Sequence, residues 1–259
     1  MAEAIVARRV VSLVPSTTES VCMLGAGDAL VGCTRYCTEP ASDVARAVRV
    51  GGTKNPAREA VAALRPDLVL ANAEENRLED IAWFRDRFSV LVQTPRTVVE
   101  AAAALRALAE RLGVLPSVVP FLLRIEAEVA AAAVDAVDAP PLRVFYAIWR
   151  KPWMSIGADT FVHDVLRRVG ATNVCATLPG RYPEVTPAEV IASSVDVVIL
   201  PSEPWEFDAA QRTELLTART FGDARVELCD GRDACWHGVR MADGLGRMRA
   251  LVGRLRSSR

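Results

Sequence analysis

Short apolar runs alternate with amphipathic stretches along the whole chain. In the first half, this pattern predicts strands at residues 10–14, 30–33, 67–71 and 89–92, and an Ala-rich helix over about 97–112. In the second half, it predicts strands at 142–148, 173–176, 196–200 and 225–229, with helices beginning near 160 and 186. Strands that alternate with helices are typical of parallel α/β sheets.

Three helix starts carry local signals. Ser16-Thr17-Thr18-Glu19 matches a capping box, and the helix it opens is predicted to stop at Gly25. Asn55-Pro56 predicts a helix with Asn as cap and Pro in its first turn, and Thr186-Pro187 predicts another.

The third strand–helix unit of each half aligns with its counterpart. Asp67 corresponds to Asp196, and a glutamate follows each aspartate by seven residues, Glu74 in one half and Glu203 in the other. This repetition predicts an α/β fold of two pseudo-duplicated, Rossmann-like lobes with parallel sheets. Residues 116–141 are rich in helix formers, and about 20 helical residues span about 30 Å. We therefore expect lobes at 1–115 and 141–259, joined by a single long rigid helix within 116–140.

Composition narrows the class of protein. The 259 residues are 51% hydrophobic and 24% charged with a net charge of −1, which favours a soluble globular protein and gives no sign of a nucleic-acid partner. No apolar run approaches 18 residues, so no membrane span is expected. The six cysteines form no C-x-x-C pair and are expected to be reduced and buried. The first residues lack a secretory signal, which predicts a cytoplasmic protein.

Aromatic residues gather in the loops that follow the predicted strands. These loops contain four of the five tryptophans and two of the three tyrosines. Ligands of open parallel sheets bind at the carboxyl ends of the strands, and aromatic side chains suit a large planar or amphipathic ligand. The candidate ligand-binding residues are Pro15, Ser16, Thr17, Arg35, Tyr36, Trp149, Arg150, Trp153, Arg181, Tyr182, Trp205, Trp236 and His237. The alternative for each loop tryptophan is that it only covers the end of a sheet.

Motifs for catalysis are missing. The sequence has no G-x-G-x-x-G, no P-loop and no G-x-S-x-G, and two histidines exclude a multi-histidine metal centre. We therefore predict no catalytic residue, no protein-held metal and no catalytic cofactor. His237 is a candidate for ligand contact, with a general base or an axial metal ligand as alternatives. An enzyme would require His237, Asp159, Arg150 and Glu184 to converge.

Three segments together resemble a known family. "RVVSLVPSTTESVCMLGAGDALVGCT" (9–34), "VGGTKNPAREAVAALRPDLVLA" (50–71) and the mid-chain helix resemble class III substrate-binding proteins of ABC importers. The loops "IWRKPWMSIGADTF", "RYPEV" and "PSEPWEF" are similar to those of the cobalamin-binding branch, also named helical backbone metal receptors.

This resemblance implies a ligand held without catalysis in an aromatic-lined cleft between two lobes that close little. Pro15, Ser16 and Thr17 would line the N-lobe side, and Trp149, Trp153, Trp205 and Trp236 the C-lobe side. Glu74 (or its neighbour Glu75) and Glu203 would dock on arginines of an ABC permease, if the protein is exported.

The expected ligand is cobalamin or another corrinoid-like metal chelate. One alternative is an iron-siderophore or haem binding protein of an ABC importer, and another is a cytoplasmic enzyme acting on a corrinoid or similar cofactor. A cytoplasmic binding protein would act as a carrier, reservoir or sensor. A misassigned start codon would instead make the protein periplasmic.

Overall fold

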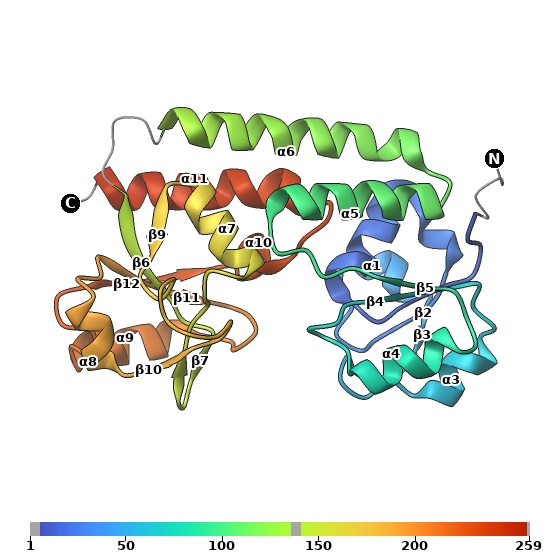
Figure 1. Cartoon of the computed structure of the whole chain (residues 1–259), viewed down its shortest axis with the longest axis horizontal. Helices are drawn as coiled ribbons and strands as arrows, with labels where there is room; N and C mark the ends of the chain where they lie inside the picture. The colour runs from blue at the N-terminus through green and yellow to red at the C-terminus, as the bar shows by residue number, and fades with distance from the viewer. Residues whose placement is uncertain (1–5, 136–140, 258–259) are drawn as a thin grey trace. The chain divides into compact units, whose positions relative to one another are not determined.

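The computed structural model describes residues 6–135 and 141–257. The chain divides into two compact units (Figure 1). Unit 1 contains the residues up to Pro95, Val99–Leu123 and His237–Arg240. Unit 2 contains Arg96–Val98, Arg124–Trp236 and the residues from Met241 onward. Each unit is built on its own parallel sheet, which confirms the predicted α/β class.

Unit 1 has a five-stranded parallel sheet in the order β3-β2-β1-β4-β5. Its strands are β1 (Val10–Ser12), β2 (Leu30–Cys33), β3 (Val48–Arg49), β4 (Leu68–Ala71) and β5 (Val90–Val92). Helices pack on both faces of the sheet, so its central strands are apolar on both sides. Val10 therefore joins one core cluster and Val11 the other.

The helices of unit 1 are short except for the last. They are α1 (Pro15–Val21), α2 (Ala41–Val44), α3 (Arg58–Ala63), α4 (Leu78–Arg85) and α5 (Val98–Arg111). A π-helical segment, Cys22–Ala26, follows α1, and the chain leaves it at Gly25 with a φ of 85°. Gly25 thus ends the helix as predicted, because a residue without Cβ tolerates this left-handed backbone.

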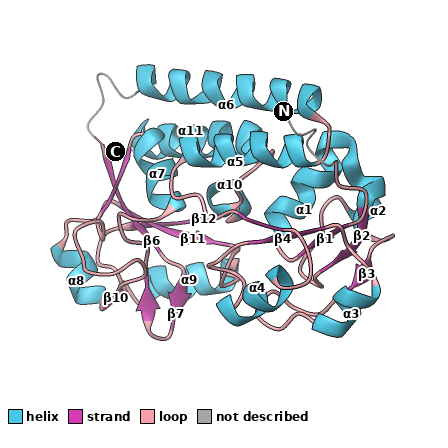
Figure 2. Ribbon diagram, turned by 45° about the vertical axis from the view of Figure 1, so that its right-hand side comes forward, coloured by secondary structure: helices cyan, strands magenta, loops and turns pink. Residues whose placement is uncertain are grey.

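Unit 2 has two sheets (Figure 2). The parallel sheet has the order β12-β11-β6-β9 and contains β6 (Leu142–Tyr146), β9 (Ala171–Asn173), β11 (Val197–Pro201) and β12 (Arg225–Cys229). The second sheet is a small antiparallel one formed by β7 (Trp149–Arg150), β8 (Trp153–Met154) and β10 (Glu184–Val185). The helices are α7 (Phe161–Arg168), α8 (Pro187–Ala192), α9 (Ala209–Thr217), α10 (Arg232–Cys235) and α11 (Met241–Ser257).

The predicted mid-chain helix is α6 (Leu115–Asp135), which passes from unit 1 to unit 2 after Leu123. Pro120 lies in its second turn. The predicted helix end near Val137 and the boundary at 140 lie outside the described residues. None of the described helices combines the length and the apolar character that crossing a bilayer requires.

Two predicted helix starts are wrong. Helix α1 begins at Pro15 with Val14 as its N-cap, so Ser16 lies inside the first turn and cannot cap the helix. Helix α3 begins at Arg58 rather than at Pro56, because Pro56 forms a β-bridge with Gly51 and Ala57 N–H donates to the Val50 carbonyl at 2.8 Å. The start at Thr186 is confirmed, with a complete capping box between Thr186 and Glu189.

Candidate functional site

The loop after β2 presents one cation and one exposed ring. Arg35 and Tyr36 form the tip of a tight turn, and Tyr36 is 52% exposed. The Arg35 guanidinium lies 5.0 Å from the centre of the Tyr36 ring, and its Nη2 donates to the Tyr36 hydroxyl at 3.2 Å. The turn therefore offers a flat aromatic surface with a fixed positive charge beside it.

The residues that follow β1 are less accessible than the turn. Pro15 opens α1, and Ser16 and Thr17 are both buried in its first turn. Thr18 donates its hydroxyl to the Val14 carbonyl at 2.9 Å, which ties the helix start to the strand end. Any ligand contact of Ser16 or Thr17 would thus involve only a small part of each residue.

Two buried asparagines organise the loop after β4. Asn76 donates its amide to the carbonyls of Leu13 (3.3 Å) and Thr53 (2.9 Å) and accepts from the backbone N–H of Asn72 (2.8 Å). The Asn72 side chain accepts from the N–H of Glu74 at 2.7 Å. These bonds join the loops after β1, β3 and β4. They also fix the backbone of Glu74 through its N–H group. Neither asparagine was among the candidate residues, although their four-residue spacing directly after a buried strand was a usable signal.

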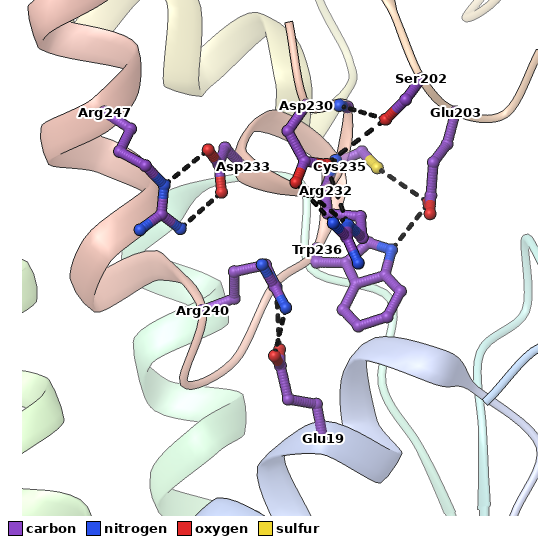
Figure 3. A network of polar contacts seen from close by, with 11 residues as sticks. Glu19, Ser202, Glu203, Asp230, Arg232, Asp233, Cys235, Trp236, Arg240 and Arg247 are labelled. Carbon is purple, nitrogen blue, oxygen red and sulfur yellow. Dashed lines mark hydrogen bonds and ion pairs between the residues drawn. The ribbon is translucent and has the colours of Figure 1, made fainter. Parts of the chain in front are cut away.

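Residues 237–240 pack within unit 1, although the other residues of that unit all lie before Arg124 in the sequence. His237 is buried, its Nε2 lies 3.5 Å from Asn72 Nδ2, and burial lowers its pKa to about 4. The Arg240 guanidinium binds the Glu19 carboxylate on α1, with its Nε 3.0 Å from Oε2 (Figure 3). The Val239 N–H donates to Ser20 Oγ at 3.2 Å. His237 is therefore a neutral, enclosed imidazole rather than an accessible one.

The predicted loop after β6 is a β-hairpin whose two tryptophans point in opposite directions. Arg150 pairs with Trp153 across the hairpin and Trp149 pairs with Met154, so Trp149 and Trp153 lie on opposite faces. Trp153 stacks on Phe207 with ring centres 6.1 Å apart and contacts Phe145 and Phe221, so it packs against the core of unit 2.

Trp149 belongs to a more open aromatic pair. It is 39% exposed and meets Trp205, from the loop after β11, edge to face with ring centres 4.5 Å apart. The indole N–H of Trp205 is buried, and no hydrogen-bond acceptor reaches it among the described residues. The two rings form one aromatic surface that comes from two strand ends.

The two candidate arginines of unit 2 are both engaged by other residues of that unit. Arg150 makes a bidentate pair with Glu214 on α9, one arm measuring 2.9 Å. Arg181 donates from Nε to the Asp159 carbonyl at 2.8 Å, and its neighbour Tyr182 is 42% exposed. Arg150 is thus turned toward α9, whereas Tyr182 offers an open ring.

A polar network lies at the carboxyl ends of β11 and β12 in unit 2 (Figure 3). The buried Trp236 donates its indole N–H to Glu203 Oε2 at 2.8 Å. Arg232 is bidentate with Asp230, and Ser202 accepts from the N–H of Gly231 at 3.0 Å. Burial raises the pKa of Glu203, an effect that the bond from Trp236 opposes.

Tyr146, the last residue of β6, was not among the candidates. It is 1% exposed, and its hydroxyl has no hydrogen-bond partner among the described residues. Burial raises its pKa well above the ordinary value for tyrosine, and the nearby Cys229, Cys235, Glu203 and Asp230 add to the shift. The described part of the chain contains no group of three or more acidic, cysteine or histidine side chains that could hold a metal ion.

The fold and these loops define a two-unit binding protein with parallel sheets. The family profile described as "Periplasmic binding protein" matches residues 10–217, and the chain belongs to that family. The family is one of binding proteins, so the prediction of a binding protein rather than an enzyme is confirmed.

Three similar proteins illustrate the family. A cobalamin-binding protein of Halobacterium salinarum is 29% identical over 201 residues, which cover 74% of this chain and 53% of the relative, so the chain spans about half the length of that relative. The periplasmic vitamin B12 binding protein BtuF of Vibrio cholerae is 22% identical with a TM-score of 0.79, covering 96% and 98% of the two chains. The periplasmic haem-binding protein BhuT, in complex with two haems, is 24% identical with a TM-score of 0.82, covering 95% and 98%.

The prediction of a cytoplasmic protein is wrong. The family is one of periplasmic, hence extracytoplasmic, binding proteins, and the similar structures are periplasmic proteins as well. The prediction failed because it was drawn from the first residues of the sequence, whereas the family is defined by the folded domain over residues 10–217.

Proposed function

We propose that this protein binds a metal chelate, with cobalamin or a related corrinoid as the ligand, and presents it to an ABC transporter without changing it chemically. The ligand is recognised by the loops at the carboxyl ends of the parallel strands. The observation that carries this proposal is the Trp149–Trp205 pair, because two aromatic rings from separate strand ends suit a broad, partly apolar ligand. The names of the relatives from Halobacterium salinarum and Vibrio cholerae support the corrinoid.

Each unit by itself offers further candidate contacts. In unit 2 the Tyr182 ring is exposed, like the Trp149–Trp205 pair. In unit 1 the Tyr36 ring is exposed, and the Arg35 guanidinium suits the amide or acidic periphery of such a ligand. The remaining candidates contribute less directly, since Trp153, Trp236 and His237 pack against protein on most of their surface.

Binding is tested with purified protein and cyanocobalamin, cobinamide, haemin and a ferric siderophore, each followed by calorimetry and by the visible spectrum. We expect a dissociation constant tighter than about 100 µM for a corrinoid. Trp149→Ala should weaken binding about tenfold, since a stacking aromatic contributes more than about 1 kcal/mol. Trp83→Ala, the same change on α4, is the matched control and should leave affinity unchanged.

Folded protein that binds none of the four ligands would contradict the proposal. Haem is the second candidate, because a haem-binding protein reaches a TM-score of 0.82 with this fold. Tight binding of haemin with no response to corrinoids would replace the first candidate with this one.

Glu74 and Glu203 are proposed to dock on the transporter. They follow β4 and β11, and each of these strands is a neighbour of the first strand of its sheet, so their places in the two units correspond. Substituting each by glutamine removes the charge and keeps the acceptor that Glu203 offers to Trp236. Both variants should bind the reconstituted permease more weakly, measured by interferometry, without a change in ligand affinity. Unaltered binding of both variants would exclude this role.

A further inference from the structure

Arg35 lies at the tip of the turn after β2, and hydrogen bonds of unit 1 fix the backbone of this turn. The Arg35 N–H donates to the Gly51 carbonyl at 2.8 Å, and the Cys37 N–H donates to the Thr34 carbonyl at 3.2 Å. Gly51 belongs to the loop after β3, the strand that pairs in parallel with β2. The turn therefore stands at the carboxyl ends of two neighbouring strands, the edge at which parallel sheets bind ligands.

The Arg35 guanidinium packs against an aromatic ring and a glycine. Its Cζ lies 5.0 Å from the centre of the Tyr36 ring, and its Nη2 donates to the Tyr36 hydroxyl at 3.2 Å. A Cβ added to Gly52 would lie 3.2 Å from Nη2 and 3.4 Å from Cζ of Arg35. Residue 52 must therefore be small for the guanidinium to keep this position. A cation that is already held in place loses less freedom when it binds a ligand.

Most N–H groups of this guanidinium are available to a ligand. A guanidinium has five N–H donors in a rigid, planar fork. Within residues 6–135 and 141–257, the Tyr36 hydroxyl is the acceptor for one of them, on Nη2, and the others have no acceptor. The Arg35 side chain is exposed, so solvent and ligands reach these donors. A pair of parallel N–H groups is thus left for two oxygen atoms of one acid group.

The charge of Arg35 is also uncompensated. Arg150 pairs with Glu214 in unit 2, and Arg240 pairs with Glu19 in unit 1. Arg35 has no carboxylate within ion-pair distance in the described part of the chain. A guanidinium stays charged at any physiological pH, so this positive charge remains available to a ligand beside the exposed Tyr36 ring.

We propose that Arg35 recognises an ionised acid group, a carboxylate or a phosphate diester, on the chelate ligand. This assignment rests on the proposed function and narrows it to chelates that carry such a group. The guanidinium fork matches the paired oxygens of both acid groups, whereas a neutral amide offers one oxygen and no charge. Cobalamin carries a phosphate diester and haem carries two carboxylates, while cobinamide lacks the phosphate diester. Arg35 therefore determines selectivity for acid-bearing chelates over neutral ones.

Calorimetry with matched pairs of ligands tests the proposal on the full-length protein. Cyanocobalamin is compared with dicyanocobinamide, and haemin is compared with its dimethyl ester. Arg35→Gln should weaken binding of an acid-bearing ligand about tenfold and leave its neutral counterpart within about twofold. A loss for cyanocobalamin identifies the phosphate diester as the recognised group, and a loss for haemin identifies the carboxylate.

Further variants separate recognition of the acid group from a structural role. Arg35→Lys keeps the charge without the fork and should restore only part of the affinity. Gly52→Ala should weaken the same ligands as Arg35→Gln, because the added Cβ crowds the guanidinium. Arg87→Gln is the matched control, since Arg87 also lies over an aromatic ring of unit 1, that of Trp83 at 4.1 Å. It should leave the affinity for all four ligands unchanged.

Two results would overturn the assignment while the proposed function stands. One is an acid-bearing ligand that binds wild type and Arg35→Gln equally well. The other is an equal loss for the acid-bearing ligand and its neutral counterpart, which would show a contact that does not depend on charge. Folded wild-type protein that binds none of the four ligands would instead remove the proposed function, and this assignment with it.

Discussion

At the scale of single residues, the two tryptophans of the β7–β8 hairpin are in opposite environments. Trp153 packs against Phe145, Phe207 and Phe221, whereas Trp149 contacts the ring of Trp205 and remains 39% exposed. Residues that alternate along a strand point to opposite faces, so one step in register decides whether a side chain is buried or presented to a ligand.

Trp153→Ala should lower the free energy of unfolding by about 3 kcal/mol, because it removes a ring from a packed aromatic cluster. Trp149→Ala should change it by less than about 0.5 kcal/mol, as an exposed substitution does. Urea denaturation followed by circular dichroism measures both. Equal losses for the two variants would show that Trp149 is also part of the core.

His237 makes the stability of the protein depend on pH. Its folded pKa of about 4 is below the unfolded value near 6.5, so the unfolded chain binds the proton first as pH falls. Stability from this residue is complete above pH 6.5 and declines by about 1.4 kcal/mol per unit until about pH 4, a total of about 3 kcal/mol. The raised pKa of Glu203 acts in the opposite direction, because there the folded state holds the proton.

The His237→Asn variant removes this titration and keeps a hydrogen-bonding side chain of similar shape. Its unfolding free energy, measured between pH 4 and pH 7, should vary less than that of the wild type, with the difference concentrated below pH 6.5. Parallel profiles for the two proteins would show that the histidine is not held neutral in the folded state.

At the scale of elements, two similar sequence signals at helix starts have different outcomes. Thr186 caps α8 and Glu189 completes the box, whereas Ser16 and Glu19 form no such box on α1. The difference is that α1 begins at Pro15 with Val14 as its N-cap, so Ser16 and Glu19 are not at the two positions that a capping box requires. Glu19 instead forms an ion pair with Arg240, whose side chains are only 11% and 15% exposed.

Thr186→Ala should lower the free energy of unfolding by about 1 kcal/mol, the usual contribution of an N-cap. Ser16→Ala, its counterpart at the start of α1, should change it by less than about 0.5 kcal/mol, because no cap is lost. Thermal and urea unfolding give both values, and an equal loss at Ser16 would restore a capping role for that residue.

At the scale of the whole molecule, a binding protein is stabilised by its ligand through mass action. A ligand present at 100 times its dissociation constant should raise the free energy of unfolding by about 2.7 kcal/mol. The melting temperature should therefore rise by several degrees with cobalamin if the proposed function holds. Trp149→Ala should show a smaller rise at the same ligand concentration, and a rise unchanged by this substitution would place the ligand elsewhere.

Most strands of the molecule were predictable because buried parallel strands are short apolar runs. β2 and β12 were predicted with their observed bounds, and β4 and β11 within one residue at each end. The β7–β8 hairpin was not predicted, since each of its strands is two residues long and β8 also pairs with the distant β10. The positions of the candidate residues in loops were predicted from the sequence. Which of these residues are exposed and which are buried was not predicted.

The sequence by itself determined the α/β class, the two-unit organisation, the long α6 helix and the loops at the strand ends, because these follow from local periodicity and propensity. Only the tertiary structure decided which loop side chains are open. It paired Trp149 with Trp205, turned Trp153 inward and brought Arg240 to Glu19. These contacts depend on packing between distant segments, and packing determines burial, charge pairing and reactivity that no local pattern contains.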